Sequence, residues 1–232
     1  MKILSVITAR GDSKKLPNKN ILKFKKKPLI AHTIISSLKS NLITKTIVST
    51  DSLRIANISR KYGAEIPFLR PKKLARDKSH SPDVVEHAVN FLEKKHNDYF
   101  DLILMLQPTS PLRTHKHLDA AIKKFLREKN QSLISISKQD FPPWWMFKIS
   151  KKKLKSQFNW KNKNVFNMER QEFPCVYKPN GAIYITTRKN FKKSKNLVNT
   201  NSCGFYLMKE EESIDIDTAL DFKIAESIKN NK

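Results

Sequence analysis

The fold is decided close to the N-terminus by the stretch Val6-Ile7-Thr8-Ala9-Arg10-Gly11-Asp12-Ser13-Lys14-Lys15-Leu16-Pro17-Asn18-Lys19-Asn20. It begins with the end of an apolar run over residues 3–7, which is typical of a strand buried on both faces. Small, basic and turn-forming residues follow from position 10. A basic, glycine-containing loop directly after the first strand of an α/β chain indicates a site for a polyphosphate.

The residues of this loop supply three kinds of anion-binding group. Gly11 permits a backbone turn that presents N–H groups to an anion, and Ser13 adds a hydroxyl. Arg10 offers phosphate a planar fork, whereas Lys14 and Lys19 offer mobile point charges. The spacing of neither a Walker loop nor a dinucleotide fingerprint is present. Basic loops are also common on a lysine-rich surface, so the residues alone leave both interpretations open.

Strands and helices alternate along the rest of the chain. This order predicts an α/β fold, a three-layer, doubly wound and mostly parallel sheet in a single domain over residues 1–232. The predicted strands cover residues 3–7, 46–49, 65–69, 102–106, 132–137, 182–186, 204–208 and 213–217. The predicted helices cover residues 28–39, 52–63, 81–92, 114–126 and 218–229.

Ligands of open α/β sheets bind at the carboxyl ends of the strands. The clearest buried strand, 102–106, runs into an irregular loop that contains Pro108 and Pro111. Gln107 can donate and accept hydrogen bonds at once, which suits a polyhydroxylated sugar. Arg113 either reaches a carboxylate or simply precedes the next helix, which Thr114 is expected to cap.

Motifs spread over nearly the whole chain resemble those of one enzyme family. The residues from Ala9 to Asn20 resemble the A-R-x-x-S-K-x-x-P-x-K-N signature of the acylneuraminate cytidylyltransferases, or CMP-sialic acid synthetases. Further matching stretches follow in the family's order: Val48-Ser49-Thr50-Asp51, Phe68-Leu69-Arg70-Pro71, Leu106-Gln107-Pro108-Thr109-Ser110-Pro111-Leu112-Arg113, Arg170-Gln171, Asn180-Gly181-Ala182-Ile183-Tyr184-Ile185 and Asp215-Ile216-Asp217. The resemblance implies a fold like that of the nucleotide-diphospho-sugar transferases.

The resemblance also implies a reaction. CTP and an acidic nine-carbon (nonulosonic) sugar would give the CMP-sugar and pyrophosphate. The motifs do not choose among sialic, legionaminic and pseudaminic acids. A guanylyltransferase on a related fold is an alternative enzyme, and a basic module that binds nucleotides or nucleic acid is the alternative outside enzymes.

Roles for individual residues follow from the same resemblance. Arg70 and Ser81 are implied to contact the cytosine, although an ion-pairing arginine and a helix cap would explain them as well. The implied nucleotide-binding residues are Ala9, Arg10, Gly11, Ser13, Lys14, Lys19, Asn20, Arg70 and Ser81. The implied sugar-binding residues are Gln107, Thr109, Arg113, Arg170, Gln171 and Asn180.

Two carboxylates near the C-terminus are candidates for a metal site. In an extended segment, a spacing of two places Asp215 and Asp217 on one face. Next to a triphosphate, such a pair forms a Mg²⁺ site in which phosphate oxygens and water complete the ligand set. The resemblance makes Arg10, Lys19, Asp215 and Asp217 the catalytic residues. Alternatively, Asp217 only caps the last helix.

The stretch 138–178 differs in composition from the rest. It is rich in aromatic residues and proline around Trp144, Trp145, Met146 and Phe147, and a basic turn follows at position 151. In the family, this region is an inserted arm that packs on a second subunit and lies close to the acceptor sugar, which implies a homodimer. The alternative is that these side chains fold back onto their own sheet.

The formal net charge of +25 suggests a polyanionic partner. Base-stacking aromatic residues do not punctuate the lysine clusters, so a nucleic-acid partner is not expected. No apolar run is long enough to span a membrane, and two cysteines are too few for a disulfide framework, which favours the cytoplasm.

Asp12 stands where many family members have glycine. Because phosphates would repel its carboxylate, we expect Asp12 to face solvent.

Overall fold

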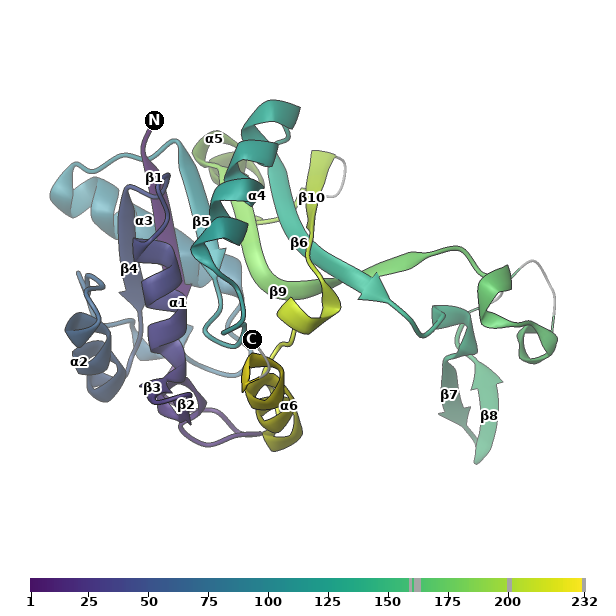
Figure 1. Ribbon diagram of the computed structural model, residues 1–232. Helices are drawn as coiled ribbons and strands as arrows, with labels where there is room; N and C mark the ends of the chain where they lie inside the picture. Colours follow the sequence, from purple (N-terminus) through teal and green to yellow (C-terminus); the bar gives the residue numbers. More distant parts are fainter. Residues whose placement is uncertain (159, 161–163, 200–201, 231–232) are drawn as a thin grey trace.

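The protein is built on a central β-sheet, seen in a computed structural model that describes residues 1–158, 160, 164–199 and 202–230 (Figure 1). Within these residues the sheet has six strands in the order β10-β6-β9-β5-β1-β4. All neighbouring pairs are parallel except those made by β9, which is antiparallel to both β5 and β6. The strands are β1 (Ile3–Thr8), β4 (Lys45–Ser49), β5 (Leu102–Leu106), β6 (Ser132–Gln139), β9 (Val176–Thr187) and β10 (Cys203–Leu207). The predicted three-layer α/β fold is therefore confirmed.

Helices cover both faces of the sheet (Figure 1). Because side chains alternate along a strand, Ile3 and Ile7 of β1 face one layer while Leu4 and Val6 face the other. The first layer contains α1 (Leu29–Leu38), α2 (Leu53–Lys61) and α4 (His115–Glu128), and the second contains α3 (Ser81–His96) and α5 (Arg188–Ser194).

Residues far apart in the sequence form a smaller third cluster. Phe24 and Leu29 near the first loop pack against Ile216 and Ala225 near the C-terminus. Ala225 belongs to α6 (Ala219–Asn230), and Phe24 belongs to the short hairpin of β2 (Lys23–Phe24) and β3 (Lys27–Pro28). This packing holds the C-terminal segment against the loop that follows β1.

Helix caps explain several of the boundaries. The Ser52 hydroxyl accepts a hydrogen bond from the Ile55 N–H at the start of α2, and Thr114 caps α4 with His117 completing a capping box. Ser81 was expected to be the cap of α3, but it is the first helical residue, and His80 precedes it without a side-chain cap bond. The Ser81 hydroxyl is therefore not used as the cap.

Two predicted strands differ from the structure. Of the segment 65–69, only Glu65 bridges to Ile47 of β4, because Pro67 has no N–H with which to extend the ladder. The segment 213–217 is extended but belongs to no strand, and it is anchored where the Ile216 N–H donates to the Thr109 carbonyl at 2.8 Å. Ile216 is fully buried, so the predicted alternation of the aspartates with it is retained.

The stretch 138–178 forms an arm that projects from the body of the molecule (Figure 1). Its neck is a two-stranded ribbon in which β6 and β9 continue beyond the sheet and pair at Lys138–Tyr177 and Gln139–Val176. The arm carries the hairpin of β7 (Phe147–Ser150) and β8 (Lys153–Ser156); residues 159 and 161–163 lie outside the described part. The inserted arm is present, as predicted.

The aromatic residues of the arm pack on one another. The Trp144 ring stacks on Phe173 at 5.4 Å, Trp145 meets Phe173 edge-on, and the Trp145 indole N–H donates to the Val165 carbonyl at 2.8 Å. Phe147 stacks on Phe166. These aromatic side chains therefore do not fold back onto the sheet.

In the described ranges, no helix is both long and apolar enough to span a membrane.

Candidate active site

A cleft of about 360 Å³ lies at the carboxyl ends of β1 and β5, the edge at which an open α/β sheet binds its ligand. The first loop, the segment 70–84, the loop after β5 and the C-terminal segment 215–217 all contribute to it. It is lined by Thr8, Arg10, Asp12, Ser13, Lys19, Asn20, Arg70, Leu74, Arg76, Asp77, Ser79, Ser81, Val84, Gln107, Pro108, Thr109, Asp215 and Asp217. Most of the predicted site residues are therefore brought together.

The first loop contributes cations and a polar anchor. Arg10, Ser13, Lys19 and Asn20 all line the cleft. The Asn20 side-chain N–H donates to the Arg10 carbonyl at 2.9 Å, which ties the two ends of the loop together. This bond holds the backbone of the loop, and Lys19 is anchored by its hydrogen bonds to the C-terminal segment.

Three predicted residues of this loop do not line the cleft. Ala9 is buried in the core, and the Gly11 N–H donates to the Asp51 carboxylate at 2.9 Å instead of pointing at a ligand. A Cβ at Gly11 would lie 3.2 Å from the Cβ of Ser52, so glycine serves a close approach to α2 there and not an unusual turn. Lys14 is largely exposed and pairs with Asp77.

Arg70 and Ser81 face the cleft together from the segment before α3 and from its first turn. The Arg70 side chain is buried, and its Nε donates to the Ser49 hydroxyl at 3.1 Å. Burial lowers the pKa of Arg70 to about 10, so the guanidinium still carries its charge at neutral pH. A buried, oriented guanidinium can present its remaining donors to acceptors on a ligand.

Gln107, Thr109 and Asp215 meet at the floor of the cleft beside Gly181. A bulge in β9 opposite residues 134–136 puts Gly181 in a left-handed conformation, with φ of +73°. A Cβ there would lie 2.8 Å from the Gln107 Oε1 and 3.3 Å from an Asp215 carboxylate oxygen. Glycine is required at this position both by the backbone and by the approach of these two side chains.

The two aspartates occupy different environments. Burial raises the pKa of Asp215, and the neighbouring Asp217 charge adds to the rise, while the Thr109 hydroxyl and Lys19 oppose it. The hydrogen bond from Lys19 lowers the pKa of Asp217, although partial burial opposes this. Lys19 donates at 2.8 Å to both the Asp217 carboxylate and the Ile216 carbonyl.

Two predicted sugar-binding residues lie beneath the cleft instead of in it. Arg113 donates to the Ala182 carbonyl and the Thr33 hydroxyl, each at 2.7 Å, and burial lowers its pKa to about 9. Asn180 accepts from Ser135 and donates to Ser213. Both side chains are buried, so their hydrogen bonds stabilise the loop after β5 and the β9 bulge. In the structure of the single chain they do not reach the cleft, and their contact with the sugar stays a prediction.

Arg170 and Gln171 lie on the arm, in the short helix Arg170–Glu172, and line no part of the cleft of their own chain. Arg170 forms an ion pair with Asp140 at the base of the arm. The structure of the single chain therefore does not bring these two predicted residues to the site.

The segment Arg76–Ser79 contributes lining residues that the sequence did not indicate. Its Arg76 and Ser79 carry polar groups, and its Asp77 binds cations of the first loop. Only the charge pattern next to Arg70 could have suggested this segment. Asp12 is exposed, as expected, but it also lines the cleft. Any phosphate bound beside it would meet a carboxylate at the rim.

Two carboxylates suit the way in which proteins hold Mg²⁺. Mg²⁺ commonly binds through one or two carboxylates, together with substrate phosphates and water. Asp215 and Asp217 both line the cleft and supply such hard oxygen ligands. Among the described residues, no group of three or more histidine, cysteine, aspartate or glutamate side chains could hold a metal by itself. The site therefore fits a metal that is shared with a polyanionic ligand.

A cleft at the carboxyl edge of a doubly wound sheet, lined by four basic and four acidic side chains, suits an enzyme of the nucleotidyltransferase class. The chain belongs to the cytidylyltransferase family, whose sequence model matches residues 4–232. This confirms the family resemblance read from the motifs.

Individual relatives share nearly the full length of the chain. It is 37% identical over 98% of its length to CMP-N,N'-diacetyllegionaminic acid synthase of Legionella pneumophila, of which it covers 96%. It is 34% identical over its whole length to N-acylneuraminate cytidylyltransferase of Escherichia coli, of which it covers 53%. Among solved structures, the fold is shared with a CMP:2-keto-3-deoxy-manno-octonic acid synthetase complexed with CTP, with a TM-score of 0.72, 16% identity, and coverage of 100% of this chain and 99% of that one.

Replacing Gly181 with alanine tests the packing at the floor of the cleft. We expect turnover to fall by about tenfold or more, because the new Cβ displaces Gln107 and Asp215. Gly63→Ala is the matched control: Gly63 also has a positive φ, of +90°, and a close neighbour in Leu38, but it lies outside the cleft. Both variants should melt at a lower temperature. Equal turnover in the two variants would contradict the role of Gly181.

Proposed function

We propose that the protein joins CTP to a nonulosonic acid and releases the CMP-sugar and pyrophosphate. The observation that carries this proposal is the convergence, in one cleft, of the first-loop cations, Arg70 with Ser81, and the Asp215–Asp217 pair. Family membership and the names of the relatives support the choice of CTP and of the acid. The acceptor is a sialic, legionaminic or pseudaminic acid.

Each group of residues has a task in this reaction. Arg10 and Lys19 hold the triphosphate and stabilise the charge that develops on pyrophosphate as it leaves. Gln107 and Thr109 orient the sugar so that its anomeric hydroxyl attacks the α-phosphorus in line. The bond from that hydroxyl oxygen to phosphorus forms as the bond to the pyrophosphate oxygen breaks, and the hydroxyl proton passes to a water molecule that acts as the base. Mg²⁺ held by Asp215 and Asp217 would supply charge neutralisation at the phosphates and lower the pKa of the bound hydroxyl.

Base recognition is assigned to Arg70 and Ser81. Cytosine presents acceptor atoms at O2 and N3, and the buried Arg70 guanidinium has donors left to meet them. Leu74 and Val84 line the same cleft and add apolar surface to it. The site is therefore suited to a base that presents acceptors on one edge.

Nucleotide binding can be tested by thermal unfolding. With Mg²⁺ present, we expect CTP at 100 times its Kd to stabilise the protein by about 2.7 kcal/mol. For a chain of this size, that corresponds to a rise of several degrees in Tm. UTP, GTP and ATP should raise the Tm much less. Equal stabilisation by all four nucleotides would contradict base recognition by Arg70 and Ser81.

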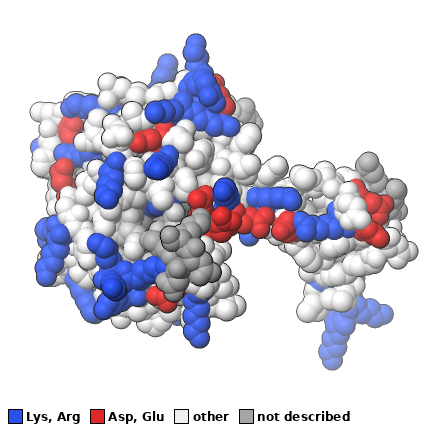
Figure 2. Space-filling view, viewed as in Figure 1, with Lys and Arg blue, Asp and Glu red and all other residues white. Residues whose placement is uncertain are grey.

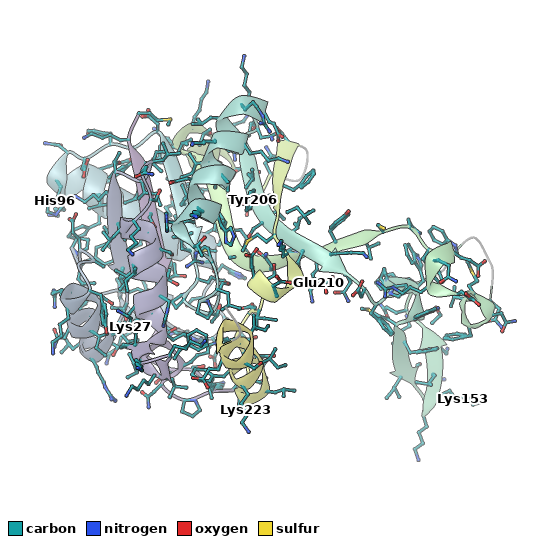
Figure 3. The ribbon with its side chains drawn as sticks, viewed as in Figure 1. Lys27, His96, Lys153, Tyr206, Glu210 and Lys223 are labelled. Carbon is teal, nitrogen blue, oxygen red and sulfur yellow. The ribbon has the colours of Figure 1, made fainter. Side chains whose placement is uncertain are left out.

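The arm supports the proposal of a homodimer. Large apolar side chains remain exposed on it, among them Ile149 at 81% and Leu154 at 66%, beside the Phe147–Phe166 stack. Figure 3 shows Lys153 at the far tip of the same hairpin. A contiguous exposed apolar surface of this kind marks a protein interface. In such a dimer, the position of the second subunit would determine whether Arg170 and Gln171 lie near the cleft of that subunit.

Light scattering tests the dimer. We expect twice the chain mass of 27.0 kDa at micromolar concentration, because the arm would bury its apolar side chains on a second copy. The double variant Ile149→Lys/Leu154→Lys should shift the mass toward that of the monomer. Leu53→Lys, at a similarly exposed position on α2, is the control and should remain dimeric. A monomeric wild type with full activity would remove the reason for assigning the arm to an interface.

The basic side chains do not form a single stripe on the face shown in Figure 2. On that face, lysine and arginine are spread over the body and the arm, with acidic side chains between them. We therefore propose that the net charge of +25 acts as a general field that attracts anionic substrates.

We place the enzyme in the cytoplasm, in keeping with its two free cysteines, Cys175 and Cys203.

A further inference from the structure

Asp77 bridges two cations of the first loop. Arg10 donates from Nη1 to Oδ1 of Asp77 at 2.8 Å, and Lys14 Nζ lies 2.5 Å from Oδ2. Each carboxylate oxygen therefore serves one cation. Asp77 and Arg10 line the cleft, and Lys14 lies directly beside it.

This arrangement resembles the one that a phosphate group would make at the same place. A phosphate offers oxygens to an arginine fork and to a lysine at once, as the carboxylate does here. The hydrogen bond from Lys14 and, after it, that from Arg10 lower the pKa of Asp77, so its carboxylate is charged at neutral pH. Asp77 thus occupies the positive subsite with a single negative charge.

The pairs with Asp77 are weak enough to be exchanged. The Asp77 side chain is 44% exposed and that of Lys14 is 80% exposed, and exposed ion pairs contribute little. The turn that carries Asp77 is closed by local bonds only, with Ser79 bonded to the backbone of Arg76 and Lys73. A ligand with several negative charges could therefore replace Asp77 without disturbing the core.

We propose that Asp77 is an affinity-determining residue of the phosphate subsite, which holds Arg10 and Lys14 until a polyphosphate displaces it. The inference deepens the proposed function and rests on it, because it assigns the triphosphate to these two cations. Asp77 competes with the incoming triphosphate, and after the reaction it competes with pyrophosphate for the same partners. It therefore weakens binding and assists release.

The test is a calorimetric titration with inorganic tripolyphosphate, without metal, of the wild type and of Asp77→Asn. Asparagine keeps the shape but removes the competing charge. We expect Asp77→Asn to bind about three- to tenfold more tightly, the scale of one or two exposed ion pairs. Asp77→Ala should behave alike and serves as a second variant, with circular dichroism to confirm folding.

Asp83→Asn is the matched control. Asp83 is exposed in the first turn of α3, does not line the cleft and, within the described residues, forms no ion pair that competes for the first-loop cations. Its removal should change affinity by less than about twofold, the effect of an unpaired exposed charge. In a Lys14→Gln background the gain from Asp77→Asn should shrink, because one of the two partners has gone.

Unchanged or weaker binding of tripolyphosphate by Asp77→Asn would overturn the proposal. Asp77 would then help to position the two cations, or would bind the ligand together with them. Equal tightening in Asp83→Asn would also overturn it, because the effect would be that of charge in general. A parallel titration with CTP distinguishes a failure of the role of Asp77 from a failure of the proposed function. If CTP binds and Asp77→Asn is no tighter, only this inference fails. If CTP is not preferred by any variant, the proposed function fails, and tripolyphosphate still decides the role of Asp77.

Discussion

Replacing either Asp215 or Asp217 with asparagine is expected to lower turnover by about two or more powers of ten, the scale on which one lost electrostatic contact slows a reaction. Asparagine keeps the size of the side chain, so the fold should survive. Asp215 lies beside Gln107 and Gly181, whereas Asp217 is half exposed and held by Lys19. We expect the Asp215 variant to lose more.

Initial rates across a Mg²⁺ titration provide the measurement. Each variant should require more Mg²⁺ for half its maximal rate, because a carboxylate ligand has become a weaker amide ligand. Asp83→Asn is the control: this carboxylate lies in the first turn of α3 but does not line the cleft. Normal turnover and normal Mg²⁺ dependence in both cleft variants would leave Asp215 and Asp217 as structural residues, and the metal would have to bind elsewhere.

Lys19→Met is expected to lower kcat/KM by about two to three powers of ten, because a nearly buried cation beside the phosphates is lost. The Lys19 side chain is only 12% exposed and donates to Asp217 and to the Ile216 carbonyl. Methionine keeps much of the apolar stem, so the packing should change little. Lys15→Met is the matched control, since Lys15 is 71% exposed and lies 3.7 Å from the same aspartate.

The pairing of Lys19 with Asp217 predicts that their variants are not additive. In a double-mutant cycle, the Lys19→Met/Asp217→Asn double variant should lose less than the sum of the two single losses. The reason is that each single variant leaves the other charge without its partner. Additive losses would indicate that Lys19 and Asp217 act on separate parts of the substrate.

Local patterns predicted much of this fold. The apolar run in β1, the helical spacing in α1 and α4, and the cap at Thr114 depend on neighbouring residues only, and all are present in the structure. The antiparallel insertion of β9 between β5 and β6 was not foreseen, because strand order depends on contacts between distant segments. The bulge at Gly181 was not foreseen either, because it also depends on the pairing of distant segments.

The site was predicted where a motif sits directly on a strand end. Gln107 and Thr109 follow β5, and Arg10 follows β1, so each reaches the cleft as expected. The placement of Arg113 and Asn180 beneath the cleft was not foreseen, because a polar residue that stabilises a loop from beneath looks the same in sequence as one that contacts a ligand. Asp77 was missed because its partners lie more than 60 residues away.

The most direct test of the proposed reaction is the release of pyrophosphate by the purified enzyme with Mg²⁺. CTP, UTP, GTP and ATP should each be offered with sialic, legionaminic and pseudaminic acids, and the sugar product identified by its mass. We expect pyrophosphate and a CMP-sugar in equal amounts, with CTP and at least one of the three acids. Pyrophosphate release without a sugar nucleotide, or equal rates with all four nucleotides, would contradict it.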